Sequence, residues 1–395
     1  MTECNKVHVV VGVSSWKSGS IKYRRHHLTE YLKQRYDTDK VYWVYPVVAK
    51  PGRIASYSRA IEVINRGIVD LDYKLKLCGF PDLIPTRLQR HSKLLQLNVL
   101  RKLKNELNKH EGKIYLWFTA PVYPFMTKVM VWDRIIYDCS DLWGSSIRSD
   151  KNKFALITNW LLRRSESKII RASDLVFATS DYLAERIEKL FKKKVLVFEN
   201  GVDFNQFKAN CNLGKNILKE IPKPRLVFIG GMKAKIDFAL LKELAEKNPG
   251  WSVILIGPEP TIENKAFDDL LLLENVHWLG KVAPGEIPFY LKYIDLGLLP
   301  YKDDQYNEAV FPVKFFEYLA AGLPVVGCGV RSTSKFSKTG IYIYTCRANF
   351  IEACRKAISW QSDESHIIER INLARASDWK SKFEQMFNEV VKRSS

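Results

Sequence analysis

The chain has 395 residues, of which 46% are hydrophobic and 27% charged; this composition excludes a disordered protein and suffices for two domains with separate cores. No apolar run is long enough to span a bilayer, and the first strand begins without the charged-then-apolar pattern of a signal peptide. The seven cysteines are scattered, with no CxxC pair and no zinc-type spacing. We therefore expect a cytoplasmic protein with free thiols and no structural metal.

The net charge of +19 lies mainly in the first half of the chain. Residues 1–205 hold 36 Lys and Arg against 21 Asp and Glu, whereas residues 206–395 hold 26 against 22. Nucleic acid is not expected as a partner, because no RNP motif, helix-turn-helix or zinc module accompanies the charge. An anionic membrane surface is the better candidate, since each basic side chain near such a surface contributes about 1 kcal/mol. We expect peripheral attachment to the inner face of the cell membrane.

The first predicted strand, residues 7–13, is a continuous apolar run typical of a parallel strand buried on both faces. A small polar loop follows, and the next helix opens with Arg24, Arg25 and His26. In a doubly wound sheet such a turn points toward the ligand, and cations at a helix N-terminus oppose the helix dipole. We interpret these three residues as contacts for an anionic sugar, a diphosphate or the acceptor; a solvated basic first turn is the alternative.

A second strand is predicted at residues 41–46 and an edge element at 73–77. Between residues 85 and 109, leucines alternate with Lys and Arg in a long helical pattern. Such a basic amphipathic helix is of the kind that lies on membranes, which agrees with the charge of this half. An ordinary core-facing helix with a charged outer side is the alternative.

Strands are also predicted at residues 114–118 and 134–138, and Asp141 comes shortly after the second of them. Asp141 is then expected on a loop at the carboxyl edge of the sheet, where ligands bind in doubly wound folds. A carboxylate there can accept the proton of an attacking hydroxyl. A helix N-cap is the alternative role, because aspartate also suits that position.

The alternation of helix and strand continues to a polar, irregular segment at residues 206–224, which we interpret as an interdomain linker. The strand after it leads into Gly230, Gly231 and Met232. Two adjacent glycines let a backbone come close to a ligand, but the spacing differs from GxGxxG and argues against a dinucleotide fingerprint. Three more predicted strands, each ending in Gly or Pro, lead to loops at the same edge of the sheet.

The stretch NEAVFPVKFFEYLAAGLPVVG predicts a loop, a short helix that begins at Pro312 and is capped by Gly322, and a buried strand. Phe311 would occupy the N-cap without a side-chain acceptor, so the first backbone N–H groups could bind an external anion, assisted by the helix dipole and by Lys314. Glu317 lies on the same helix face and could accept hydrogen bonds from the two hydroxyls of a ribose. This pattern indicates a nucleotide-sugar site; a solvated Lys/Glu pair is the alternative.

Several segments resemble those of known glycosyltransferases. PVKFFEYLAAGLPVV resembles the donor-binding helix of GT-B glycosyltransferases, particularly family four, in which the lysine and glutamate contact the phosphate and ribose of the sugar nucleotide. SSWKSGSIKYRRHHLTEYL is similar to glycosyltransferases of the teichuronic-acid type, and YDCSDLW resembles the acceptor-domain site of the glucuronosyltransferases of xanthan-type assembly. The resemblance implies an α/β protein of the GT-B fold, with two Rossmann-like doubly wound domains facing a central cleft.

The same resemblance implies the domain organisation. Residues 1–205 would form an N-terminal acceptor-binding domain, residues 206–224 the linker and residues 225–375 a C-terminal nucleotide-sugar-binding domain. Residues 376–395 would form a last helix that crosses back to the N-terminal domain through an aromatic stripe.

In that family the loops at the edge of the second sheet hold the nucleotide base and the sugar. The resemblance therefore implies nucleotide-sugar contacts at Gly230, Gly231, Met232, Lys281, Tyr301, Val313, Lys314 and Glu317. Glu308 joins Arg24, Arg25 and His26 as a candidate contact for an anionic sugar or the acceptor.

The resemblance implies a metal-independent glycosyltransferase with a UDP-sugar as donor and a lipid-linked saccharide of cell-surface polysaccharide assembly as acceptor. UDP-glucuronate is the expected donor, because the similar enzymes use it and the candidate residues are basic. Asp303 and Asp304 do not form a DxD motif, so we expect no metal and no cofactor besides the donor.

The stereochemistry depends on which resemblance holds. The xanthan-type enzymes invert and their base aligns with Asp141, so we expect inversion with Asp141 as the base. Family four retains configuration and has seven residues between its two motif glutamates, whereas eight separate Glu308 from Glu317. The alternatives are a retaining family-four-type transferase of another UDP-sugar, a non-catalytic sugar-nucleotide-binding protein of a polysaccharide complex, and a sugar-nucleotide epimerase of the GT-B fold.

Overall fold

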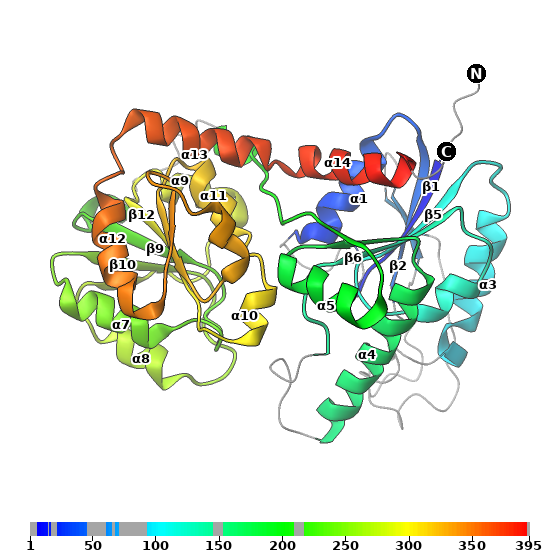
Figure 1. Ribbon diagram of the computed structural model, residues 1–395, viewed down its shortest axis with the longest axis horizontal. Helices are drawn as coiled ribbons and strands as arrows, with labels where there is room; N and C mark the ends of the chain where they lie inside the picture. The colour runs from blue at the N-terminus through cyan, green and yellow to red at the C-terminus, as the bar shows by residue number, and fades with distance from the viewer. Residues whose placement is uncertain are drawn as a thin grey trace. The chain divides into compact units, whose positions relative to one another are not determined.

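The chain divides into two compact units, each with its own sheet, mainly parallel in unit 1 and parallel in unit 2 (Figure 1). Unit 1 comprises Met1–Phe198 with Phe383–Ser395, and unit 2 comprises Glu199–Lys382. The computed structural model describes residues 6–14, 16, 22–45, 61–64, 68–70, 93–144, 153–208 and 217–392. The edge element predicted at 73–77 lies outside the described residues.

The sheet of unit 1 has eight strands in the order β4-β3-β2-β1-β5-β6-β7-β8. Strands β1, β2 and β5 to β8 pair in parallel, and β3 and β4 add an antiparallel edge. The strands are β1 Lys6–Val11, β2 Thr38–Val44, β3 Ile61–Ile64, β4 Ile68–Asp70, β5 Ile114–Phe118, β6 Arg134–Cys139, β7 Leu175–Ala178 and β8 Val195–Val197. The continuous apolar runs become strands buried on both faces, as predicted.

Helices cover both faces of this sheet (Figure 1). The elements are α1 Arg24–Gln34, α3 Lys93–Leu107, the 3-10 turn η2 Pro124–Lys128, α4 Lys153–Ala172 and α5 Asp181–Phe191. In sequence order β2 is added on one side of β1 and β5 on the other, so the sheet direction switches between β1 and β5. Ligands of open α/β sheets bind beyond the carboxyl ends of the strands at such a switch point.

Helix α3 differs from the membrane-lying helix predicted at residues 85–109. Among its described side chains, Leu100, Leu103 and Leu107 are buried, so this part of its apolar side faces the core of unit 1. The core-facing alternative is therefore correct for the described part of the helix. Hydrophobic burial outweighs any use of these leucines at a membrane, because they cannot contact lipid and the core together.

The sheet of unit 2 has six parallel strands in the order β11-β10-β9-β12-β13-β14. They are β9 Arg225–Ile229, β10 Ser252–Ile256, β11 Val276–Trp278, β12 Leu296–Pro300, β13 Val325–Cys328 and β14 Tyr342–Tyr344. Chain direction across the sheet switches between β9 and β12, so their carboxyl ends mark the expected ligand edge.

The helical elements of unit 2 surround this sheet. They are α6 Asn205–Lys208, η4 Ile217–Glu220, α7 Phe238–Lys247, α8 Lys265–Leu271, η5 Pro284–Glu286, α9 Ile287–Leu291, α10 Gln305–Ala309, α11 Lys314–Ala320, η6 Arg331–Phe336, η7 Arg347–Asn349, α12 Phe350–Ile358 and α13 Glu364–Ala376. The segment predicted as a linker, 206–224, belongs to unit 2 rather than lying between two domains. The described end of this segment packs on unit 2 because the side chains of Leu218 and Ile221 are part of the buried core of that unit.

The last helix, α14 (Trp379–Lys392), contributes to both units: residues up to Lys382 group with unit 2 and those from Phe383 with unit 1. Its apolar stripe within unit 1 is buried, and the ring of Phe383 lies 5.9 Å from that of Tyr31 on α1. This arrangement buries the aromatic stripe that the sequence shows at helical spacing.

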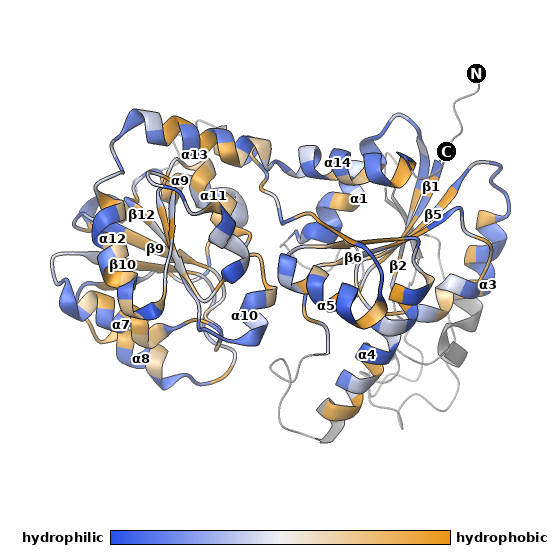
Figure 2. Cartoon of the chain, viewed as in Figure 1, coloured by the Kyte–Doolittle hydropathy of each residue, from blue (hydrophilic) through white to orange (hydrophobic). Residues whose placement is uncertain are grey.

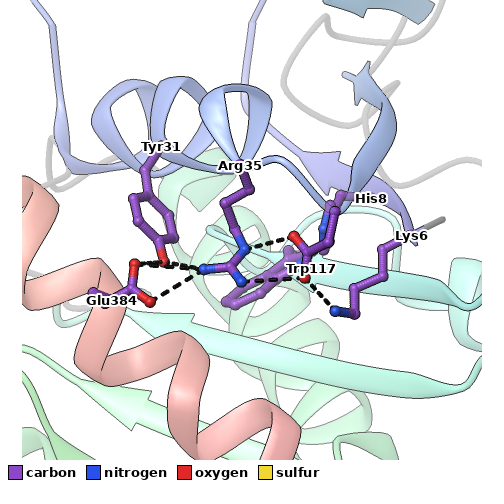
Figure 3. A network of polar contacts seen from close by, with 7 residues as sticks. Lys6, His8, Tyr31, Arg35, Trp117 and Glu384 are labelled. Carbon is purple, nitrogen blue, oxygen red and sulfur yellow. Dashed lines mark hydrogen bonds and ion pairs between the residues drawn. The ribbon is translucent and has the colours of Figure 1, made fainter. Parts of the chain in front are cut away.

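A polar network fastens α14 to unit 1 (Figure 3). Arg35, directly after α1, donates from Nη1 to the hydroxyl of Tyr31 at 2.6 Å and to Glu384 of α14 at 3.3 Å. Its Nε donates to Asp37 at 2.9 Å, and Lys6 of β1 forms an ion pair with the same carboxylate. One guanidinium thus joins α1, α14 and the start of the sheet.

Replacing Arg35 by Met should lower the free energy of unfolding by about 3 kcal/mol, because the buried Asp37 carboxylate loses its bidentate partner. Urea unfolding followed by circular dichroism measures the change. The matched control is Lys109→Met, which removes an exposed pair with Glu106 and should cost no more than about 1 kcal/mol. Equal losses of stability in both variants would show that the pairing of Arg35 with the buried Asp37 carboxylate does not stabilise the fold more than an exposed ion pair does.

Comparing the wild type with Arg35→Met at different pH values gives a second test. Burial alone would raise the pKa of Asp37, but hydrogen bonds from Arg35 and Lys6 outweigh it and hold this pKa below its usual value. A depressed carboxyl pKa stabilises the fold above the unfolded-state pKa of about 3.9, and this stabilisation is lost as the pH falls through the folded-state pKa. The difference in stability between wild type and Arg35→Met should therefore be full at neutral pH and shrink in acid.

Candidate functional site

The ligand edge of unit 2 is built by loops that approach one another closely. Strand β9 ends at Ile229 and continues into Gly230, whose N–H donates to the Ile256 carbonyl at the end of β10 at 2.9 Å. A Cβ atom on Gly257, after β10, would lie 1.8 Å from the Gly230 carbonyl oxygen, so only glycine fits there. The Gly257 N–H in turn donates to the carbonyl of Gly280 at 2.8 Å.

This chain of contacts places several predicted residues. Gly230 and Gly231 are half-buried, whereas the side chain of Met232 belongs to the core, so Met232 can offer a ligand its backbone alone. Lys281 directly follows Gly280 and is exposed. Tyr301, after β12, is buried in the core, 6.5 Å ring to ring from Phe228, and burial raises its pKa.

Helix α11 corrects the predicted boundaries of the central stretch. It begins at Lys314 with half-buried Val313 at the N-cap, rather than at Pro312 after Phe311. Phe311 lies instead in an aromatic cluster, with its ring 5.4 Å from that of Phe316, because burial of the ring outweighs any role at a helix end. Residues 307–309, predicted as loop, belong to the short helix α10. Gly322 follows the helix with φ +79°, as expected for a glycine cap.

Lys314 and Glu317 lie on one face of α11, as predicted. The Lys314 ammonium and the Glu317 carboxylate form an ion pair of 2.6 Å, with side chains 27% and 18% exposed. The pair is therefore partly accessible, and both charges can be reached by one ligand. A diphosphate at Lys314 and ribose hydroxyls at Glu317 would replace an interaction that each side chain now makes with the other.

Tyr318 fixes this face relative to the glycine loop, a role not recognised from the sequence. Its buried hydroxyl accepts a hydrogen bond from the Ile229 N–H at 2.9 Å, which joins α11 to the end of β9. A Cβ atom on Gly297 would lie 2.5 Å from the Tyr318 ring, so glycine in β12 makes room for it. No local pattern in the sequence signals this role, because both partners of Tyr318 lie far from it along the chain.

Asn307 has a similar role for α10, the helix that carries the half-buried Glu308. The buried Asn307 amide donates to the carbonyls of Lys235 at 3.1 Å and Lys302 at 2.9 Å. These carbonyls belong to the loops after β9 and β12. Asn307 therefore holds Glu308 near the same edge of the sheet as the glycine loop.

In unit 1, the basic residues predicted at the start of α1 differ in burial and in their contacts. Arg24 is buried, and its Nε donates to Asp138 of β6 at 2.8 Å. His26 is buried against the ring of Trp43, 5.5 Å away, and burial together with the charge of Arg25 lowers its pKa to about 4. His26 is therefore neutral near pH 7 and can contact a ligand only as a neutral hydrogen-bonding group.

Arg25 is the member of this cluster that is suited to an anion. It is half-buried, and its guanidinium lies 4.5 Å from the ring centre of Tyr23, which is 51% exposed. Its Nε has no hydrogen-bond partner among the residues that the structure describes. The arginine and the tyrosine together offer a cation and a flat apolar surface.

Asp141 lies on the loop directly after β6, as predicted, and is half-buried. Asp138 belongs to the strand, also as predicted. Because side chains alternate along a strand, Asp138 faces α1, where Arg24 binds it, whereas Tyr137 and Cys139 face the other side. The end of β6 is thus held from both faces.

A buried carboxylate not recognised from the sequence, Glu166 of α4, supplies the second contact. The Tyr137 hydroxyl donates to its Oε1 at 2.9 Å, and the Cys139 sulfur lies 3.8 Å from the same oxygen. Cys139 also lies 3.6 Å from the Asp141 carbonyl oxygen. Burial raises the pKa of Glu166. Glu166 therefore helps to position the loop of Asp141 through its contacts with Tyr137 and Cys139 at the end of β6.

In residues 6–392, apart from the undescribed segments, no group of three or more His, Cys, Asp or Glu side chains is arranged to hold a metal ion. The polar groups at the two sheet edges are instead lysine, arginine, single carboxylates and backbone N–H groups.

Replacing Tyr318 by Phe should lower the free energy of unfolding by roughly 1 to 3 kcal/mol, because the buried Ile229 N–H is left without its acceptor. Hydrogen exchange measured by mass spectrometry should show faster exchange in the peptide that contains the end of β9. Tyr290→Phe, at a half-buried tyrosine of α9, is the control. Unchanged exchange in the Tyr318 variant would show that the hydroxyl does not hold α11 to β9.

Comparison with known proteins identifies the family and the fold of the chain. Residues 223–359 match the family model described as glycosyl transferases group 1. Over 393 residues the chain is 35% identical to a Bacillus subtilis (strain 168) protein named putative teichuronic acid biosynthesis glycosyltransferase TuaH, covering 96% of each chain.

Two solved structures with low sequence identity share the fold. Sucrose-phosphate synthase from Thermosynechococcus elongatus has a TM-score of 0.66 at 14% identity, over 98% of this chain and 99% of that one. Anabaena HepE in complex with UDP has a TM-score of 0.61 at 14% identity, over 98% of this chain and 100% of that one. The chain therefore belongs to the group 1 glycosyltransferases and has the GT-B fold, as its sequence motifs predicted.

Proposed function

We propose that the protein transfers glucuronate from UDP-glucuronate to a hydroxyl of a lipid-linked saccharide, in the assembly of a teichuronic-acid-type polysaccharide. The observation that carries the donor half of this proposal is the Lys314–Glu317 pair on α11, held beside the glycine loop at the switch point of unit 2. The polysaccharide class is taken from the name of the Bacillus subtilis relative.

A nucleoside diphosphate is the donor group that best fits the edge of unit 2. Lys314 supplies one positive charge for the diphosphate, and Glu317 supplies a carboxylate for two vicinal hydroxyls. Uridine is proposed as the base because solved structures of HepE, a protein of the same fold, contain UDP and glucose. Lys281 and the backbone of Gly230 to Met232 are the proposed contacts for the base and the sugar.

Glucuronate is proposed as the sugar because Arg25 offers a cation at the edge of unit 1. Its guanidinium, stacked on Tyr23, can bind a carboxylate of the sugar or an anionic group of the acceptor. Tyr23 can pack against the apolar face of a sugar ring. The acceptor is proposed to be lipid-linked, at the inner face of the membrane, because unit 1 carries most of the positive charge of the chain.

The proposed reaction is a single displacement. Asp141 removes the proton of the acceptor hydroxyl while its oxygen forms a bond to the anomeric carbon. The bond from that carbon to the UDP oxygen breaks, and UDP leaves with its added charge stabilised by Lys314. The sugar changes anomeric configuration, the proton ends on Asp141, and no metal ion is required by this scheme.

Lys314→Ala and Glu317→Ala should each weaken UDP binding about ten- to a hundredfold, because a charge-assisted hydrogen bond contributes roughly 1.5 to 3 kcal/mol. Isothermal titration calorimetry measures the affinity. Lys247→Ala is the matched control, because Lys247 forms a 2.7 Å pair with Glu243 on the outer face of α7. Wild-type affinity in both α11 variants would exclude this face as the donor site.

Asp141→Asn should lower turnover by a factor on the order of 10² to 10⁴, because the amide keeps the shape of the side chain but cannot accept the proton. UDP affinity should stay near the wild-type value, since it depends on unit 2. The assay measures UDP release with UDP-glucuronate and a lipid-linked saccharide, and Glu185→Gln on the exposed side of α5 is the control.

The product of this assay also separates the alternatives. Inversion at the anomeric carbon, measured by NMR, supports the proposal. Retention together with full activity of Asp141→Asn would favour a retaining transferase. Binding of UDP without turnover of any UDP-sugar would favour a non-catalytic binding protein.

A further inference from the structure

Helix α4 presents a surface that the proposed chemistry does not use. Three large apolar side chains near its start are exposed to solvent: Leu156 at 66%, Ile157 at 48% and Trp160 at 55%. Their i, i+1 and i+4 spacing places them within about 100° around the helix axis and therefore on one side of the helix. In Figure 2 the hydrophobic residues of α4 gather in its N-terminal half.

The same side of α4 continues as a run of cations. Arg163, Arg164, Lys168 and Arg171 are all exposed. The guanidinium of Arg164 lies 5.2 Å from the ring centre of Trp160, which links the two parts of the surface. In the part of α4 whose side chains are described, the single carboxylate is Glu166, and it is buried.

The position of the helix explains why these apolar groups stay uncovered. Four of its five buried side chains, Ser165, Glu166, Ile169 and Ile170, lie in the C-terminal half, which packs on the sheet of unit 1; in the described part of the N-terminal half only Asn159 is buried. The N-terminal half extends beyond the sheet (Figure 1). The exposed face of α4 is therefore apolar near its N-terminus, beyond the sheet, and basic toward its C-terminus, where the helix packs on the sheet.

We propose that this face of α4 docks unit 1 onto an anionic lipid bilayer. Leu156, Ile157 and Trp160 enter the headgroup region, where the amphipathic tryptophan ring is favoured, and the cations lie level with the lipid phosphates. The helix lies along the surface; among the described residues no helix is long and apolar enough to cross a membrane.

Charge decides between a bilayer and a second copy of the chain. Pairing α4 with itself would bring two sets of four cations together without a carboxylate between them, which is unfavourable. An anionic bilayer supplies the complementary charge, and residues 1–205, to which the helix belongs, carry a surplus of positive charge. The surface extends the membrane location proposed above and differs from the 85–109 helix predicted from the sequence.

Co-sedimentation of the full chain with vesicles tests the proposal without substrate, so its failure would leave the transferase assignment standing. Wild type should bind vesicles of phosphatidylcholine and phosphatidylglycerol, and binding should fall as salt rises. Binding to phosphatidylcholine alone should be much weaker. Equal binding to both vesicle types would overturn the proposal.

Two α4 variants locate the surface. Arg164→Glu with Lys168→Glu should lower the partition coefficient at least about thirtyfold, since each lost cation removes about 1 kcal/mol. Trp160→Ala should lower it roughly tenfold through lost apolar burial.

Two controls complete the experiment. Arg101→Glu with Lys104→Glu, on the exposed side of α3, makes the same change in net charge and should retain most of the binding. Leu272→Ser, at an exposed leucine of unit 2, should bind as wild type. Loss of binding in the α3 variant equal to that in the α4 variant would show that net charge, not the α4 face, determines binding.

Self-association is tested on the same proteins by sedimentation velocity. A wild-type dimer that Trp160→Ala dissociates, with vesicle binding unaffected, would assign the surface to a second copy and overturn the proposal. A monomer whose vesicle binding depends on Trp160 supports it.

Discussion

The hydrogen bond from the Ile229 N–H to the Tyr318 hydroxyl is the contact on which the geometry of the sheet edge in unit 2 depends. It joins the end of β9, where the glycine loop begins, to the helix that carries Lys314 and Glu317. Both partners are buried, so the bond is made in a low dielectric and its loss leaves an unpaired donor. Glycine at 297 is the second condition, because any side chain there would displace the tyrosine ring.

In unit 1, contacts with charged residues hold the carboxyl end of a strand in position. The last residues of β6 are bound on one face by Arg24 and on the other by Glu166, and Asp141 follows directly. These contacts hold the end of the strand in place and limit the conformations open to the loop that carries Asp141. Arg24, which the sequence analysis placed beside a ligand, therefore contacts the strand instead, whereas Arg25 is only half-buried.

Two amphipathic helices of unit 1, α3 and α4, show why the pattern alone does not locate a surface. Both α3 and α4 alternate apolar and basic residues, and the sequence singled out the region of α3. In the structure the described leucines of α3 face the core, whereas Leu156 and Trp160 of α4 face solvent. A helical period reports that two faces differ, but the neighbouring elements decide which face is covered.

The sequence by itself determined the class of fold, most of the parallel strands and the motif on α11, because buried parallel strands and a lysine and glutamate three residues apart are local patterns. It placed Asp141 on its loop for the same reason. It did not predict the antiparallel edge strands β3 and β4. It could not determine where α11 begins, since Phe311 is drawn into an aromatic cluster by distant residues, or that His26 is neutral, since burial beside Trp43 lowers its pKa. The partners of Arg24, Tyr318 and Glu166 lie far along the chain in sequence, and only the tertiary structure brings them into contact.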